Sequence, residues 1–244
     1  MNDQPLTWSR EAICLRPSSW DLRSIAADLY RRTCRVNFDR PGFCVLHLGR
    51  DIDSFALRQV MVDLKREMAA IHESTTGNTL VYLSAARFDQ QGTTRPHLDG
   101  GPDECFLMLG YEPSAIDSEL EIYDYARCAF DRDLTPNEFM VKHNPMFESG
   151  HDILRPYKTR VPCFSKTDYW ILCINNSCSP YSESQPTWQG TLHAATIASP
   201  EESKRRVINS TMIVSVPVGT PDFIDDDQVQ EFLSTSAFRR QDGG

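Results

Sequence analysis

Residues 87–101, with the sequence RFDQQGTTRPHLDGG, contain the stretch that decides how the rest of the chain is interpreted. At its centre lies His97-Leu98-Asp99. In an extended chain, residues i and i+2 point to the same side, so one imidazole and one carboxylate can face a common ion. Two histidines and one carboxylate on one side of a metal leave adjacent positions open, as in non-haem iron sites. The pair therefore predicts a metal site that takes a second histidine from elsewhere in the chain.

That second histidine and a nearby cation are found on two predicted strands downstream. His193 lies in WQGTLHAAT, and thirteen residues later Arg206 opens the strand RVINSTMIVSVP, on which Ser210 would share its face. A dicarboxylate that chelates a metal through one end needs a cation for its far carboxylate, and the rigid guanidinium fork suits that task. We therefore predict His193 as the third ligand and Arg206 with Ser210 as the carboxylate site. Arg205 is the alternative if the register is shifted by one residue.

The other four histidines are weaker candidates. His143 and His151 flank a loop that could cover the site, and they are the alternatives to His193. His47 falls in a predicted buried strand and His72 at the end of a predicted helix, so structural roles are expected for both.

Helices come first along the chain and short strands dominate after residue 79. This order predicts an α+β protein with a β-sandwich or barrel core. We expect one domain over 1–244, with helical support over 20–75, a β core over 79–217 and a C-terminal helix and tail over 222–244. The expected helices are 21–33, 54–73 (capped by Ser54), 115–144 and 222–235, and the expected strands are 43–49, 79–88, 105–111, 160–164, 169–175, 191–196 and 205–217.

Composition narrows the classes of function. The 244 residues carry a formal net charge of −9, which argues against a general binder of nucleic acid or anionic membranes. No apolar run approaches the ~20 residues of a membrane span, and the N-terminus lacks a secretory pattern. Eight cysteines without a CxxC pair are expected to be reduced and buried. We therefore expect a cytoplasmic protein without nucleic-acid or membrane partners.

HxD, a distal His and a following Arg together resemble the Fe(II)/2-oxoglutarate-dependent oxygenase superfamily. The opening run ArgPhe…Gly…HisxAsp resembles the strand and loop before the iron ligands in prolyl-hydroxylase-like members. Arg205-Arg206-Val-Ile-Asn resembles the closing strand of taurine-dioxygenase-like and phytanoyl-hydroxylase-like members. The likeness covers residues 79–217, and its motifs are short, so it indicates a superfamily and no particular enzyme.

The resemblance implies a double-stranded β-helix (jelly-roll) core, with Fe(II) held by His97, Asp99 and His193. It also implies a dioxygenase that couples decarboxylation of 2-oxoglutarate to oxidation of a substrate by O2. Halogenating relatives replace the carboxylate ligand with a small residue, so Asp99 favours hydroxylation or desaturation. Phe88 lacks the hydroxyl that some members place near the cosubstrate, and Tyr82 or Ser84 would have to supply it.

A small-molecule substrate is expected, with Arg87, Arg95 and Trp188 as candidate contacts. Two other functions stay open. A cupin-like dioxygenase or isomerase would keep the metal without 2-oxoglutarate, and a non-catalytic β-helix module would sense a ligand or bind a partner protein.

Overall fold

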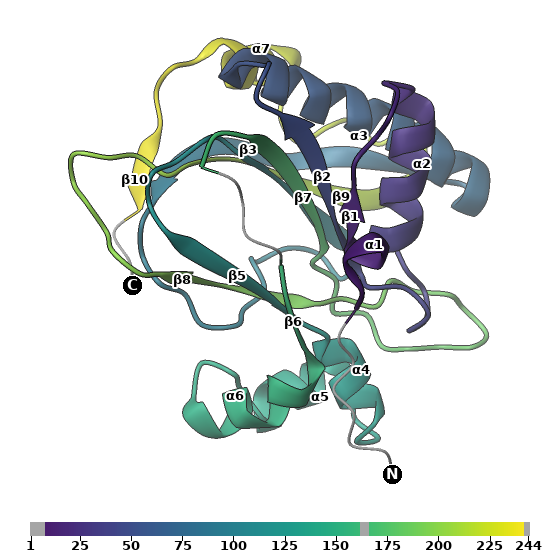
Figure 1. Cartoon of the computed structure of the whole chain (residues 1–244). Helices are drawn as coiled ribbons and strands as arrows, with labels where there is room; N and C mark the ends of the chain where they lie inside the picture. Colours follow the sequence, from purple (N-terminus) through teal and green to yellow (C-terminus); the bar gives the residue numbers. More distant parts are fainter. Residues whose placement is uncertain (1–7, 162–165, 242–244) are drawn as a thin grey trace.

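A computed structural model describes residues 8–161 and 166–241, and its largest feature is a seven-stranded sheet (Figure 1). The five central strands of this sheet are antiparallel to their neighbours, whereas the two outermost strands pair in parallel. Its strand order is β1 (Cys14–Leu15), β2 (Phe43–Gly49), β7 (Tyr169–Asn175), β4 (Cys105–Tyr111), β9 (Val207–Pro217), β3 (Asn78–Gln90) and β10 (Arg239–Gln241).

A smaller antiparallel sheet lies opposite the large one (Figure 1). Its strand order is β6 (Lys158–Arg160), β5 (Ser118–Tyr123) and β8 (Leu192–Ile197). Leu107 and Leu172 of the large sheet pack in one buried cluster with Leu120 and Ile122 of the small sheet. The two sheets therefore share an apolar interior, and a site between them is partly buried.

Two amphipathic helices cover the outer face of the large sheet, α2 (Leu22–Thr33) and α3 (Ser54–Thr76) (Figure 1). Asp21 caps α2 and Asp53 caps α3, each accepting a bond from a backbone N–H three residues on. The expectation that Ser54 caps the second helix is therefore wrong by one residue. α3 ends at Gly77, whose φ of 77° is the left-handed conformation that glycine adopts without strain.

The remaining helices flank this two-sheet core. Thr135 and Glu138 form a capping box at the start of α5, with Pro136 in the first turn. α7 contacts α3 and β3 near the C-terminal end of the described chain. The bounds are α1 (Arg10–Ile13), α4 (Tyr125–Phe130), α5 (Pro136–Lys142), α6 (Glu148–Leu154), the 3-10 helix η1 (Arg155–Tyr157) and α7 (Asp226–Ser234).

One predicted element is corrected. The segment 115–144 was expected to be helical throughout, yet its first part is the strand β5. Leu120 and Ile122 are buried while Glu119 and Glu121 lie outward, which is the two-residue period of a half-buried strand. Residues 162–164 of another predicted strand fall outside the described residues.

The mixed helix-and-strand architecture with a large sheet agrees with the predicted α+β class. Among the described residues, no helix combines the length and the apolar character that crossing a membrane requires.

Candidate metal centre

His97, Asp99 and His193 come together at one point between the two sheets. One ligand atom of each residue lies within 4.8 Å of the others. Nε2 of His97 is 3.5 Å from Oδ1 of Asp99, and the two imidazole centroids are 4.3 Å apart. Residues from two distant segments thus present two imidazoles and one carboxylate to a common point, as the sequence predicted.

The edge of β8 fixes the segment that carries His97. The backbones of His97 and His193 exchange two hydrogen bonds, of 3.1 and 3.2 Å. Thr94 extends this pairing, because its N–H donates to the carbonyl of Ala195 and its hydroxyl accepts from the N–H of Ala195. The loop after β3 therefore lies against the edge of β8 through an isolated bridge, which holds the backbone of His97 in place.

The three side chains differ in protonation. Burial opposes the charged form of His97, but its hydrogen bonds to Asp99 and to the carbonyl oxygen of Arg95, 2.7 Å from Nδ1, raise its pKa. A metal bound at Nε2 would therefore displace the proton that this nitrogen shares with Asp99. Burial lowers the pKa of His193 to about 4, so this imidazole is neutral near pH 7. Burial opposes ionisation of Asp99, but its hydrogen bond with His97 and the charges of His193 and His97 together lower its pKa.

His193 also carries a polar atom that the protein leaves unsatisfied. Its Nδ1 is buried and has no hydrogen-bond partner within the described parts of the chain. A buried polar group of this kind is uncommon in folded proteins and calls for a bound species. The donor set of two imidazoles and one carboxylate suits a divalent transition metal, whose binding would release the proton held on His97.

Arg206 lies in the same cavity and is 3 % exposed. Its Nε donates to the hydroxyl of Ser118 at 3.1 Å, and its Nη1 donates to the side-chain oxygen of Gln90 at 3.0 Å. The ring of Tyr111 lies 5.4 Å from the guanidinium carbon. Nη2 is buried without a hydrogen-bond partner among the described residues. The guanidinium is therefore held in one orientation with a donor left over.

The cavity that joins these groups has a volume of about 260 Å³ and mainly apolar walls. Strand alternation explains its lining, since Leu107, Leu109 and Tyr111 of β4 face inward together. Ser210 and Ser84 also line it, so Ser210 lies on the same side of the large sheet as Arg206.

Tyr82, the alternative to Ser84, is corrected. The β3–β9 register shifts between Tyr82 and Ser84, so an irregularity at Leu83 changes which residues face the cavity. Tyr82 packs in the cluster under the helices, with the ammonium of Lys65 4.5 Å from its ring centroid. Simple alternation would have put both hydroxyls on one face.

Arg205 and Arg87 also lie outside the cavity. Arg205 is exposed, 3.7 Å from the carboxylate of Asp89, so it is not the residue that enters the cavity. Arg87 points to the helical face of the large sheet and pairs with Glu112 at 2.8 Å. Its neighbour Phe88 lines the cavity, so strand alternation turns Arg87 away from it, and the predicted substrate role of Arg87 is not supported.

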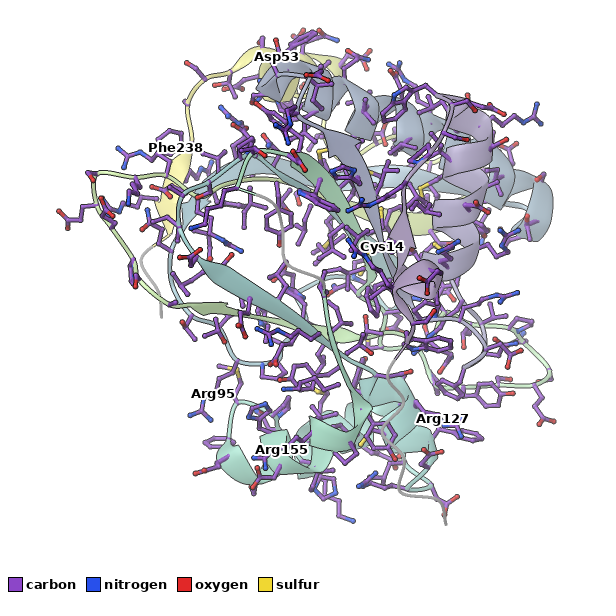
Figure 2. All side chains as sticks on the ribbon, in the orientation of Figure 1. Cys14, Asp53, Arg95, Arg127, Arg155 and Phe238 are labelled. Carbon is purple, nitrogen blue, oxygen red and sulfur yellow. The ribbon has the colours of Figure 1, made fainter. Side chains whose placement is uncertain are left out.

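The two other candidate substrate contacts do not line the cavity. Trp188 is buried on the far side of the large sheet, with its ring centroid 5.2 Å from that of His72. Arg95 lies beside the segment before α6, where it donates to the carbonyl of Met146 at 2.9 Å (Figure 2). Of the two, only Arg95 is near the metal-binding loop.

The alternative histidine ligands are placed apart from the cluster. Nε2 of His151 contacts the hydroxyl of Tyr123 at 3.0 Å, and His143 stacks near Phe139. Neither belongs to the three-residue group, so the choice of His193 is supported.

Sequence reasoning missed the residues that orient this site, namely Gln90, Tyr111, Ser118 and Asn176. Tyr111 could have been found, because it lies four residues after Leu107 on a predicted strand and so shares its face. Ser118 could not, since its segment was expected to be helical.

Comparisons with known proteins found only distant structural likeness. No protein-family model matches the sequence, and no curated protein matches it either. Two solved structures of an enzyme described as the iron and alpha-ketoglutarate-dependent endoperoxidase NvfI, one of them a variant, align at 14 % identity. They cover 75 % and 76 % of this chain and 80 % of each of those chains, with TM-scores of 0.40 and 0.39. Likeness of this degree carries no argument about the fold or activity of this chain.

Proposed function

We propose that this protein is a non-haem Fe(II)- and 2-oxoglutarate-dependent oxygenase of the double-stranded β-helix type. One observation carries the proposal. Two imidazoles and a carboxylate share a cavity with a buried arginine that keeps one unpaired donor. A bound metal would explain the cluster of two imidazoles and a carboxylate, and an anionic cosubstrate would explain the unpaired donor of the arginine.

His97, Asp99 and His193 would hold the iron. Two neutral nitrogens and one negative oxygen leave the remaining coordination positions open to small molecules. The Arg95 carbonyl would keep His97 in the tautomer that presents Nε2, and the β8 edge would hold both imidazoles in place. When bound, the iron supplies the redox chemistry that couples decarboxylation of 2-oxoglutarate to oxidation of the substrate.

Arg206 would bind the far carboxylate of 2-oxoglutarate through Nη2, with the hydroxyl of Ser210 as a second donor. Burial lowers the pKa of Arg206 because a charged group is costly in an apolar cavity, and a carboxylate would offset that cost. Gln90 and Ser118 occupy the other donors and leave Nη2 for the ligand. The chain would therefore select a dicarboxylate that spans from the metal to the guanidinium.

The apolar walls would keep water from the reacting atoms. Phe88, Leu109 and Ile208 line the cavity between the cluster and the sheet. Exclusion of water strengthens the electrostatic contacts inside and protects reactive species. Because the carboxylate ligand is present, we propose oxidation of a small molecule, with hydroxylation as the expected outcome and succinate and CO2 as co-products.

The test is an anaerobic titration of Fe(II)-loaded protein with 2-oxoglutarate, followed by the visible metal-to-ligand charge-transfer band. Wild-type protein should develop the band, and His97→Ala should abolish it. Arg206→Ala should need about 100-fold more 2-oxoglutarate, because a buried charged hydrogen bond is lost. Arg205→Ala is the matched control. Arg205 is adjacent to Arg206 but exposed and outside the cavity, so this variant should titrate like wild type.

Two outcomes would favour the rival functions. Iron binding without the band, and without an effect of Arg206→Ala, would favour a cupin-like enzyme in which the substrate itself chelates iron. No binding of iron, and no stabilisation by it, would favour a non-catalytic ligand-sensing module.

A further inference from the structure

Asn176 lies one residue beyond the end of β7 and is 2 % exposed. Its side-chain amide contacts Asp99 at both backbone polar groups. Oδ1 accepts from the N–H of Asp99 at 3.0 Å, and Nδ2 donates to the carbonyl of Asp99 at 2.7 Å. The amide thus pairs with Asp99 as a neighbouring strand would, although it is a side chain.

The amide is itself held firmly. The N–H of Asn176 donates to the carbonyl of Cys105 at 3.0 Å, and Sγ of Cys105 lies 3.6 Å from the Asn176 carbonyl. These contacts extend the pairing of β4 and β7 by one residue beyond the sheet. Asn176 is therefore a rigid extension of the large sheet that reaches across to the metal-binding loop.

The two sides of the His-x-Asp segment are held in different ways. His97 is fixed by backbone pairing with His193 of β8, which depends on no side chain. Asp99 is followed by two exposed glycines, and at Gly100 no atom lies within 4 Å of the place where a Cβ would stand. Glycine gives the chain the greatest backbone freedom, so Asp99 needs a separate anchor on this side.

We propose that Asn176 is a positioning residue that orients Asp99 toward the metal. The inference rests on the proposed function, because it assumes that Asp99 is a ligand. Partners that orient ligands typically change metal affinity by about 10- to 100-fold when they are removed. Asn176 holds the backbone of Asp99, and the backbone sets the direction in which the carboxylate leaves the chain.

Asn175 provides a matched control. It is adjacent, 0 % exposed, and its side chain also makes two hydrogen bonds. Its Nδ2 donates to the carbonyl of Thr33 at 2.9 Å, and its Oδ1 accepts from the N–H of Ser177 at 3.1 Å. Substitution by alanine removes the same amide atoms at either position, but only the amide of Asn176 contacts Asp99.

The experiment titrates the metal-free full chain with Co(II) and records both affinity and the visible absorption bands of the bound ion. Asn176→Ala should bind Co(II) about 10- to 100-fold more weakly than wild type and shift the bands, since a ligand is misplaced. Asn175→Ala should keep the wild-type spectrum and an affinity within about 3-fold of wild type, even if its thermal unfolding temperature falls. Asn176→Asp preserves the size of the side chain but loses the donor to Asp99, and should also weaken binding.

The outcomes are separable. If wild type binds Co(II) and either folded Asn176 variant matches its affinity and spectrum, the positioning role is overturned while the metal site stands. If Asn175→Ala weakens binding as much as Asn176→Ala, the effect is general loss of packing and the inference is also overturned. If wild type binds no metal, the proposed function itself fails, and the inference fails with it.

Discussion

Two buried arginines on opposite faces of the large sheet have opposite surroundings. Arg87 faces the helices, where it donates to Asn209, to the Thr235 carbonyl and to the carboxylate of Glu112. Arg206 faces the cavity, where its side chain donates to the neutral groups of Ser118 and Gln90 and Nη2 has no partner among the described residues. The buried carboxylate of Asp89 acts on the guanidinium by its charge, but its hydrogen bond is with the backbone N–H of Arg206. Burial of a charge is costly unless it is paired, so the second arrangement is explained by a ligand and the first needs none.

Two histidines show the same contrast between a side chain with all its hydrogen bonds made and one with an unpaired atom. His72 is bonded at both nitrogens, to the hydroxyl of Tyr30 at 2.8 Å and that of Ser215 at 2.9 Å. His193 leaves Nδ1 unpaired in the described structure. Burial lowers the pKa of each to about 4. Similar pKa values thus accompany different surroundings, and the completed hydrogen bonds of His72 distinguish it from the candidate ligand His193.

The sharpest test of this contrast is Arg87→Met, which should lower the free energy of unfolding by about 3 to 5 kcal/mol. The substitution leaves the partly buried carboxylate of Glu112 without its closest ion-pair partner. The measurement is urea-induced unfolding of the metal-free protein. A loss below about 1 kcal/mol would mean that the helical face does not depend on this pair.

His72 should make the metal-free protein less stable in acid. Its folded pKa of about 4 lies below the ordinary value near 6.5, so the unfolded state takes up the proton first. Stability from this group is fully present above pH 6.5 and is lost as pH falls toward 4, by up to about 3 kcal/mol.

The check compares urea unfolding at pH 7 and pH 4.5 for wild type and His72→Gln. The variant should be less stable at pH 7, because both histidine hydrogen bonds are changed, but should lose less on acidification. Equal losses in the two proteins would show that His72 is not protonated on unfolding in this range.

The sequence predicted the parts of the site that follow from local pattern. The bounds of β2, β4 and β7 agree with the apolar runs, and the structure brings together His97, Asp99 and His193, which residue type and spacing had singled out. The sequence favoured Arg206 and left Arg205 as the alternative, and the structure shows that Arg206 is the one that lines the cavity.

Other features depend on contacts between distant segments and could not be predicted locally. The irregularity at Leu83 turns Tyr82 away from the face of Ser84, against simple alternation, and nothing in the run VYLSAARF indicates it. Asn176 contacts Asp99 across 77 positions of sequence, so its role appears only when the sheets are assembled. Asn after a strand is otherwise typical of a turn.

Arg206→Met should have the opposite sign to Arg87→Met in the metal-free protein. It removes a buried charge that lacks a carboxylate partner on the described chain and fills its place with apolar atoms. We expect the free energy of unfolding to stay unchanged or to rise by about 1 kcal/mol. Urea unfolding measures this, and a loss as large as that of Arg87→Met would show that the guanidinium is a structural element of the empty protein.

The smallest expected effect belongs to Ser210→Ala. Ser210 lines the cavity on the face of Arg206, and its hydroxyl would add one hydrogen bond to the distal carboxylate. Loss of one such bond costs about 1 kcal/mol, so 2-oxoglutarate should bind about 5-fold more weakly. Ser84→Ala is the companion variant, since Ser84 lines the same cavity from β3. The anaerobic charge-transfer titration measures both. A loss confined to Ser210→Ala would place the distal carboxylate beside β9. A loss confined to Ser84→Ala would place it beside the neighbouring strand β3, and Arg206 would then bind it together with Ser84.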